Sequence, residues 1–88
     1  MILYHSKKFG KQFKKLPENL RSAFDSRVRL FLIDKYHPAL NNHLLRGEYF
    51  GCSSINITGD YRAIFRESDS GQAVIFLEIG DHHQLYGK

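Results

Sequence analysis

The period of the hydrophobic pattern changes partway along this 88-residue chain, and that change restricts the fold more than any other feature. Up to Tyr36, apolar side chains recur every three or four residues, the spacing that places them on one face of a helix. From Tyr49 onward the period is two, over residues 53–57 and over residues 61–66, which is the spacing of strands. Helices are therefore expected in the first half and strands in the second, which indicates an α+β fold.

A short strand and a helix are predicted at the start of the chain. Ile2 to His5 has the composition of a strand, and Ser6 is a suitable N-cap for a helix from Lys7 to about Leu16. One face of this helix is apolar, with Phe9, Phe13 and Leu16. The other face is basic, so this helix is expected to have a buried side and a charged side.

A second, longer helix is predicted directly after the first. Pro17 ends the first helix and fits the first turn of the next one. The second helix is expected to reach about Tyr36, because His37-Pro38 disfavours its continuation. Its apolar stripe contains Leu20, Ala23, Phe24, Val28, Phe31, Leu32 and Tyr36.

Three strands are predicted to follow a loop over residues 38–47. Two short turns, at residues 58–60 and 68–71, separate them, so the strands should form an antiparallel meander. The third strand, Ala73 to Ile79, is apolar enough to be central. The prediction is a β-α-α-β-β-β order in one domain, residues 1–88, with the helical hairpin on one face of a small, mainly antiparallel sheet.

The helical hairpin must bury its stripes on the sheet, and this predicts the core. The expected helical members are Phe13, Phe24, Val28 and Phe31. Their expected partners on the sheet are Ile55, Ile57, Ile64, Ile75 or Leu77, with the face used by each strand left open.

The net charge of +4 is concentrated near the N-terminus. Five lysines and no acidic residue lie within the first fifteen residues: Lys7, Lys8, Lys11, Lys14 and Lys15. A basic helix on a small domain favours a phosphate-rich or acidic partner, so these lysines are candidates for RNA binding. The alternative is a solvated helix face without a partner.

The compartment is predicted from cysteine use and hydropathy. Cys52 is the only cysteine, so no intrachain disulfide can form, which fits a reducing compartment. The N-terminal apolar run is too short for a secretory signal, and no run approaches the roughly 18 apolar residues of a membrane span. We therefore expect a cytoplasmic protein.

The last nine residues, Gly80 to Lys88, carry groups that can move protons near neutral pH. His82, His83 and Tyr86 follow directly after the predicted central strand, which could hold them rigidly. A frayed polar tail is the alternative. Leu85 argues against fraying, because a disordered tail seldom carries apolar anchors.

Three segments of the second half resemble the RelE/ParE superfamily of toxins from bacterial toxin–antitoxin modules. They are residues 43–51, which include His43 before Leu45-x-Gly47, the hairpin 55–65 with Asp60-Tyr61-Arg62, and the ending 79–87. The nearest branch is the YafQ-type mRNA interferases. The resemblance implies a RelE-like microbial RNase fold, an antitoxin partner, and cleavage of mRNA on the ribosome without a metal ion or other cofactor.

The resemblance also implies the residues that carry the reaction. An acid and a base are needed for the leaving 5′-oxygen and the ribose 2′-hydroxyl, and a cation is needed for the phosphate. The residues that match the family's pattern are His43, Asp60, Arg62, His82 and Tyr86. Asn56 stands where the YafQ-type branch has a further histidine and Tyr61 where it can have Trp, so the identity of the general base stays open.

Two other functions compete with the nuclease. A ParE-like protein that inhibits DNA gyrase by binding would share the fold and Arg62, but would not need His43 or His82. A basic nucleic-acid-binding module without chemistry is the other alternative. The adjacent His82-His83 pair lacks the spacing of a metal site, and the lone Cys52 adds no further ligand motif, so no metal is expected.

Overall fold

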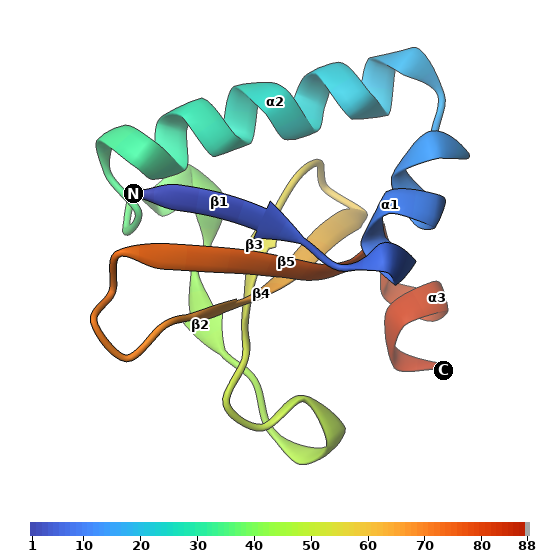
Figure 1. Ribbon diagram of the computed structural model, residues 1–88. Coiled ribbons are helices and arrows are strands. Elements are labelled where there is room, and N and C mark those ends of the chain that lie inside the picture. The colour runs from blue at the N-terminus through green and yellow to red at the C-terminus, as the bar shows by residue number, and fades with distance from the viewer. Residues whose placement is uncertain (88) are drawn as a thin grey trace.

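The computed structural model describes residues 1–87 and contains one five-stranded sheet (Figure 1). The strand order is β1-β5-β4-β3-β2. β1 runs parallel to β5, and all other neighbours are antiparallel, so the predicted meander is confirmed. The strands are β1 (Ile2–His5), β2 (His43–Leu44), β3 (Ser53–Asn56), β4 (Tyr61–Glu67) and β5 (Ala73–Asp81).

Two helices cover one face of this sheet, as predicted, and a third follows β5 (Figure 1). The helices are α1 (Lys7–Lys14), α2 (Glu18–Ile33) and α3 (His82–Tyr86), with 3-10 turns η1 (Pro38–Leu40) and η2 (Gly47–Tyr49). Ser6 caps α1 as expected: its Oγ accepts a hydrogen bond from the backbone N–H of Phe9 at 2.9 Å. The same hydroxyl donates to the carbonyl of Leu77 at 2.8 Å, which ties the start of α1 to β5.

The second helix ends earlier than predicted. It stops at Ile33, because Asp34 has an extended backbone and its carboxylate accepts a hydrogen bond from the N–H of Tyr36 at 3.1 Å. This local bond offers the backbone an alternative to the helix. Leu32 and Tyr36 are 49% and 70% exposed, so their assignment to the buried stripe was wrong.

The main core lies between the hairpin α1–α2 and the sheet. Phe31 is buried there, while Phe13, Phe24 and Val28 pack against it half-buried. The rings of Phe9, Phe24 and Phe76 are neighbours, with centroids 5.2–5.8 Å apart. The buried side chains from the sheet are Ile55, Ile57, Ala63, Phe65, Val74, Phe76 and Ile79.

Three of the predicted sheet partners do not belong to this core. Ile64 and Leu77 face the other side of the sheet, and Ile75 is half-buried outside the core. Ile64 lies on that side by ordinary alternation, because its neighbours Ala63 and Phe65 face the helices. In β5 the cause is an irregularity in the pairing with β4: Ile64 pairs with Glu78, but the next residue, Phe65, pairs with Phe76. Leu77 is thus an extra residue, a β-bulge, which shifts the alternation of β5.

A second, smaller core occupies the opposite face of the sheet. Its buried members are Cys52, Ile64 and Leu85, and Leu45, Tyr49, Leu77 and Tyr86 pack against them. Central strands that are covered on both faces are apolar throughout, which explains the continuous apolar run in β5. This second core joins α3 to the sheet.

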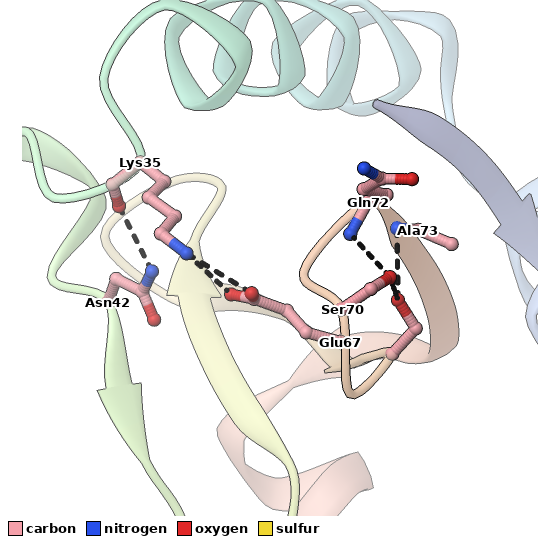
Figure 2. Close-up of polar contacts among 7 residues, drawn as sticks. Lys35, Asn42, Glu67, Ser70, Gln72 and Ala73 are labelled. Atoms are coloured by element: carbon pink, nitrogen blue, oxygen red, sulfur yellow. Dashed lines mark hydrogen bonds and ion pairs between the residues drawn. The ribbon is translucent and has the colours of Figure 1, made fainter.

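The segment after α2, predicted as a loop, contains η1 and the short strand β2. Figure 2 shows how it is attached to the sheet. Lys35 Nζ contacts the Glu67 carboxylate of β4 at 3.1 Å, and Asn42 Nδ2 donates to the Lys35 carbonyl at 3.0 Å. Leu40 is fully buried. These contacts fix the chain immediately before His43.

The C-terminal segment is folded, which excludes a frayed tail over residues 80–87. Asp81 and Gln84 form a capping box at the start of α3, and Gly87 ends the helix in a left-handed conformation (φ 67°). Gly80 permits the close approach of α3, because a Cβ there would lie 2.9 Å from Gln84 Oε1. Leu85 is buried and anchors the helix.

Candidate active site

A cavity of about 410 Å³ opens on the face of the sheet away from α1 and α2. Ser54 and Arg62 alternate with Ile55 and Ala63, which face the helices, so their side chains project to the opposite face. Four of the five predicted catalytic residues line this cavity, and they come from β2, β4 and α3. The complete lining is Asn41, His43, Leu45, Ser54, Arg62, His82 and Tyr86.

His43 is oriented by the turn that precedes β2. Its Nδ1 lies 2.7 Å from the carbonyl oxygen of Asn41. A carbonyl can only accept, so Nδ1 carries the hydrogen, and Nε2 of the neutral ring is left as the basic nitrogen. Asn41 has a left-handed backbone (φ 48°), a conformation that Asn adopts more readily than most residues. The turn thus fixes both the ring and its tautomer.

Arg62 is held by the β3–β4 turn. Its Nη1 donates to the carbonyls of Thr58, Gly59 and Tyr61 at 3.1–3.2 Å. Nε and Nη2 make no hydrogen bond to any residue in the described part of the chain. The guanidinium is therefore positioned by one nitrogen and keeps donors for an anion at the cavity.

His82 and Tyr86 lie one turn apart on α3. Their ring centroids are 4.7 Å apart, and both line the cavity. Tyr86 also meets Tyr49 edge to face, with centroids 5.9 Å apart. The Tyr49 hydroxyl donates to the Leu85 carbonyl at 3.0 Å, so Tyr49 helps to position the helix that carries both residues.

The phenol of Tyr49 stays protonated at neutral pH. Burial raises the pKa of Tyr49 to about 12, and the nearby Glu78 carboxylate adds to the rise.

Glu78 also forms an ion pair with Lys8 of α1 at 3.3 Å. Lys8 therefore contacts β5 while remaining exposed. The other lysines are also exposed: Lys7, Lys11 and Lys14 on α1, and Lys15 at its C-cap.

Asp60 is the predicted catalytic residue that does not line the cavity. It is exposed in the turn before β4. Asn56 pairs with Arg62 in the sheet, and its Oδ1 is buried without a hydrogen-bond partner among residues 1–87. With Asp60 outside the cavity, the two histidines are the candidates there for proton transfer.

Sequence reasoning missed three residues of the lining. Asn41, Leu45 and Ser54 join the cavity through the pairing of β2 with β3, which places His43 opposite Ser54. The alternation over residues 53–57 shows that Ser54 and Asn56 share a face. The two-residue strand β2 is too short to give a pattern, so its register could not be predicted.

The lining has a cationic character. It contains one arginine and two histidines, and no Asp or Glu among the residues that the structure describes. Such a cavity favours an anionic ligand, and its volume is of the order expected for small-molecule sites.

Among residues 1–87, no group of three or more His, Cys, Asp or Glu side chains is placed to hold a metal ion. No helix in the same range is long and apolar enough to cross a membrane.

No protein-family model matches the sequence, and no curated protein matches it. Solved structures match over nearly the whole chain. The YoeB/ParE toxin from Agrobacterium tumefaciens gives a TM-score of 0.77 at 19% identity, covering 93% of this chain and 99% of that one. YafQ from Escherichia coli gives 0.76 at 19% identity, covering 97% of both chains.

A third match is the RelBE2 toxin–antitoxin complex from Mycobacterium tuberculosis. It has a TM-score of 0.66 and 23% identity, and covers 92% of this chain and 96% of that one. All three are toxins or contain one, and the fold predicted from the sequence resemblance is confirmed. This chain has the α+β fold of the RelE/ParE toxins.

Proposed function

We propose that this protein is the toxin of a type II toxin–antitoxin module and that it cleaves mRNA on the translating ribosome. One observation carries the proposal: His43, Arg62, His82 and Tyr86, from three separate segments, line a single cavity. A chain that used the fold only to bind a protein would not need two histidines beside Arg62 in one cavity.

The reaction needs only groups that the chain supplies. His43 Nε2 takes the proton from a ribose 2′-hydroxyl, and the resulting oxygen attacks the adjacent phosphorus. Arg62 balances the charge that develops on the phosphate oxygens. His82, protonated, gives its proton to the departing 5′-oxygen. The products are a 2′,3′-cyclic phosphate and a 5′-hydroxyl, and each histidine ends in the opposite protonation state.

Tyr86 has a different proposed role. Its ring lies against His82 and at the cavity, where it can stack on a base of the bound strand. Asp60 remains a candidate only as a contact to RNA outside the cavity. The five lysines of residues 7–15 bind RNA phosphates, with Lys8 partly committed to Glu78.

The proposed partners are the mRNA, the ribosomal RNA and a cognate antitoxin, and the proposed compartment is the cytoplasm. The RelBE2 structure is of a toxin with its antitoxin, which supports the same kind of partner here. The basic surface of α1 would suit an acidic antitoxin as well as RNA, so an antitoxin could cover it and block binding of RNA.

The test is mRNA cleavage in a translating extract, beside the same mRNA incubated without ribosomes. The proposal expects cuts only during translation, with 2′,3′-cyclic phosphate ends. A gyrase-dependent DNA-cleavage assay runs in parallel. If DNA is trapped on gyrase and mRNA stays intact, the ParE-like function replaces this one.

A further inference from the structure

Ser54 has a buried hydroxyl in the wall of the cavity. The residue is fully buried, and its Oγ has no hydrogen-bond partner among residues 1–87. Buried polar groups in folded proteins are almost always hydrogen-bonded, because leaving one unbonded costs free energy. A hydroxyl that lines a cavity and lacks a hydrogen-bond partner in the protein therefore points to a ligand in the cavity as its partner.

The sheet places this hydroxyl among the cavity's charged side chains. Ser54 pairs with His43 on β2 and with Ile64 on β4. Directly paired residues of antiparallel strands project to the same face, so Ser54 and His43 face the same side. Arg62 lies two residues before Ile64 on β4 and therefore also projects to this face.

The chemistry of the lining decides what this hydroxyl would bind. Histidine and arginine side chains lie beside it, and no carboxylate lines the cavity within residues 1–87. A serine hydroxyl can donate to an anionic oxygen, and such charge-assisted hydrogen bonds are the strong ones. A phosphate oxygen is negatively charged and accepts hydrogen bonds, so it suits both the arginine and the serine hydroxyl.

We propose that Ser54 is a substrate-binding residue whose hydroxyl donates to a nonbridging phosphate oxygen of RNA in the cavity. This inference rests on the proposed function, because that function makes RNA the ligand. It adds a contact that the family resemblance does not assign. The contact is to an oxygen of the backbone, so it should not depend on the base.

The test is Ser54→Ala, with RNA affinity and thermal stability measured on the same samples. The probe is a single-stranded 2′-O-methyl oligoribonucleotide, which keeps the phosphates and cannot be cleaved through the 2′-oxygen. Affinity should fall about tenfold, the loss of one charge-assisted hydrogen bond. The melting temperature should not fall, because the hydroxyl has no protein partner to lose. The salt dependence should stay the same, since serine carries no charge.

Ser53→Ala is the matched control, because Ser53 is the neighbouring residue on β3 and does not line the cavity. It should bind the probe as the wild type does. Ser54→Cys, similar in shape with a much weaker donor, gives the same comparison if the alanine variant does not fold.

Three results would overturn the inference: equal affinity of Ser54→Ala and wild type, an equal loss in Ser53→Ala, or no binding of the probe by wild type. A failure of the proposed function looks different. In that case the wild type binds the probe through Ser54 and yet leaves mRNA intact in the translating extract.

Discussion

At the scale of single residues, the cavity side chains are fixed through atoms that the proposed reaction does not use. His43 is held through Nδ1 and Arg62 through Nη1, both by backbone carbonyls. His43 Nε2 and the Nε and Nη2 of Arg62 are left to contact the substrate. Catalytic groups work best when their supporting contacts leave only the reacting atoms free, so this arrangement is suited to proton transfer and phosphate binding.

Tyr49 gives a residue-scale prediction about pH. Its pKa is raised from the usual 10.0 to about 12, so the folded protein holds this proton more tightly than the unfolded chain. The stabilisation is complete below pH 10 and is lost as the pH rises toward 12. Thermal melts from pH 8 to 11.5 should show a steeper loss for wild type than for Tyr49→Phe.

The control for this experiment is Tyr4→Phe, because Tyr4 is exposed on β1. Its melting temperature should follow the wild-type curve across the range. At neutral pH, Tyr49→Phe should cost about 1 kcal/mol, the loss of the hydrogen bond to Leu85. Parallel curves for wild type and Tyr49→Phe above pH 10 would show that the phenol is not perturbed.

At the scale of elements, the short helix α3 depends on its junction with β5. Five residues do not form a stable helix alone, so the capping box, Leu85 and the Tyr49 hydroxyl must hold it. Gly80, the buried residue before the cap, lies close to Gln84 and Leu85 of α3. We therefore expect the positions of His82 and Tyr86 to depend on a residue that does not line the cavity.

Gly80→Ala tests this dependence. The added Cβ would lie 2.9 Å from Gln84 Oε1 and 3.3 Å from Gln84 Cβ, so the Gln84 side chain must leave the capping box and α3 must give way by a few tenths of an ångström. A shift of this kind should lower the rate of mRNA cleavage by about 10–100-fold and the stability by about 1–3 kcal/mol. Gly59→Ala is the control, since a Cβ there meets nothing within 4 Å. Equal cleavage rates for the two variants would show that the packing of α3 on Gly80 does not matter.

At the scale of the whole molecule, the lysine-rich helix α1 and the helix α3, which carries His82 and Tyr86, lie at the same end of the sheet (Figure 1). Gln12 of α1 accepts a hydrogen bond from the N–H of Ile79 at 2.9 Å, and α3 begins three residues later. A strand of RNA bound at the cavity could therefore continue along the lysines of α1. The lysines near the N-terminus and the cavity residues would then bind the same RNA strand.

Lys11→Ala tests this continuity through salt. Removing one phosphate contact to single-stranded RNA should reduce the magnitude of the slope of log affinity against log salt by about 0.7. Lys8→Ala should reduce it less, because Lys8 already pairs with Glu78. Unchanged slopes for Lys7, Lys11, Lys14 and Lys15 variants would mean that this face is only solvated or binds the antitoxin instead.

The sequence predicted the elements better than their pairing. Local periodicity was enough for α1, the meander and the order of the elements that it marks, and Ser6 was correctly assigned as a cap. It did not indicate the helix α3. The bulge at Leu77, the strand β2 and the end of α2 at Asp34 were missed, because each depends on pairing or on a single side-chain bond. Ser54 was missed for the same reason. His43, Arg62, His82 and Tyr86 were singled out through a family resemblance, and no local pattern indicated that they would share a cavity.

His82 is proposed to transfer a proton in mRNA cleavage, and His82→Ala removes the imidazole that would do so. His83→Ala is the matched control, because it removes the neighbouring exposed imidazole of α3 that does not line the cavity. Cleavage in a translating extract should fall about 10²–10⁴-fold for His82→Ala, the usual loss for a general acid or base. Its melting temperature should stay close to that of the wild type, and His83→Ala should cleave at nearly the wild-type rate. Cleavage by His82→Ala at the wild-type rate would show that His82 does not transfer a proton in the reaction.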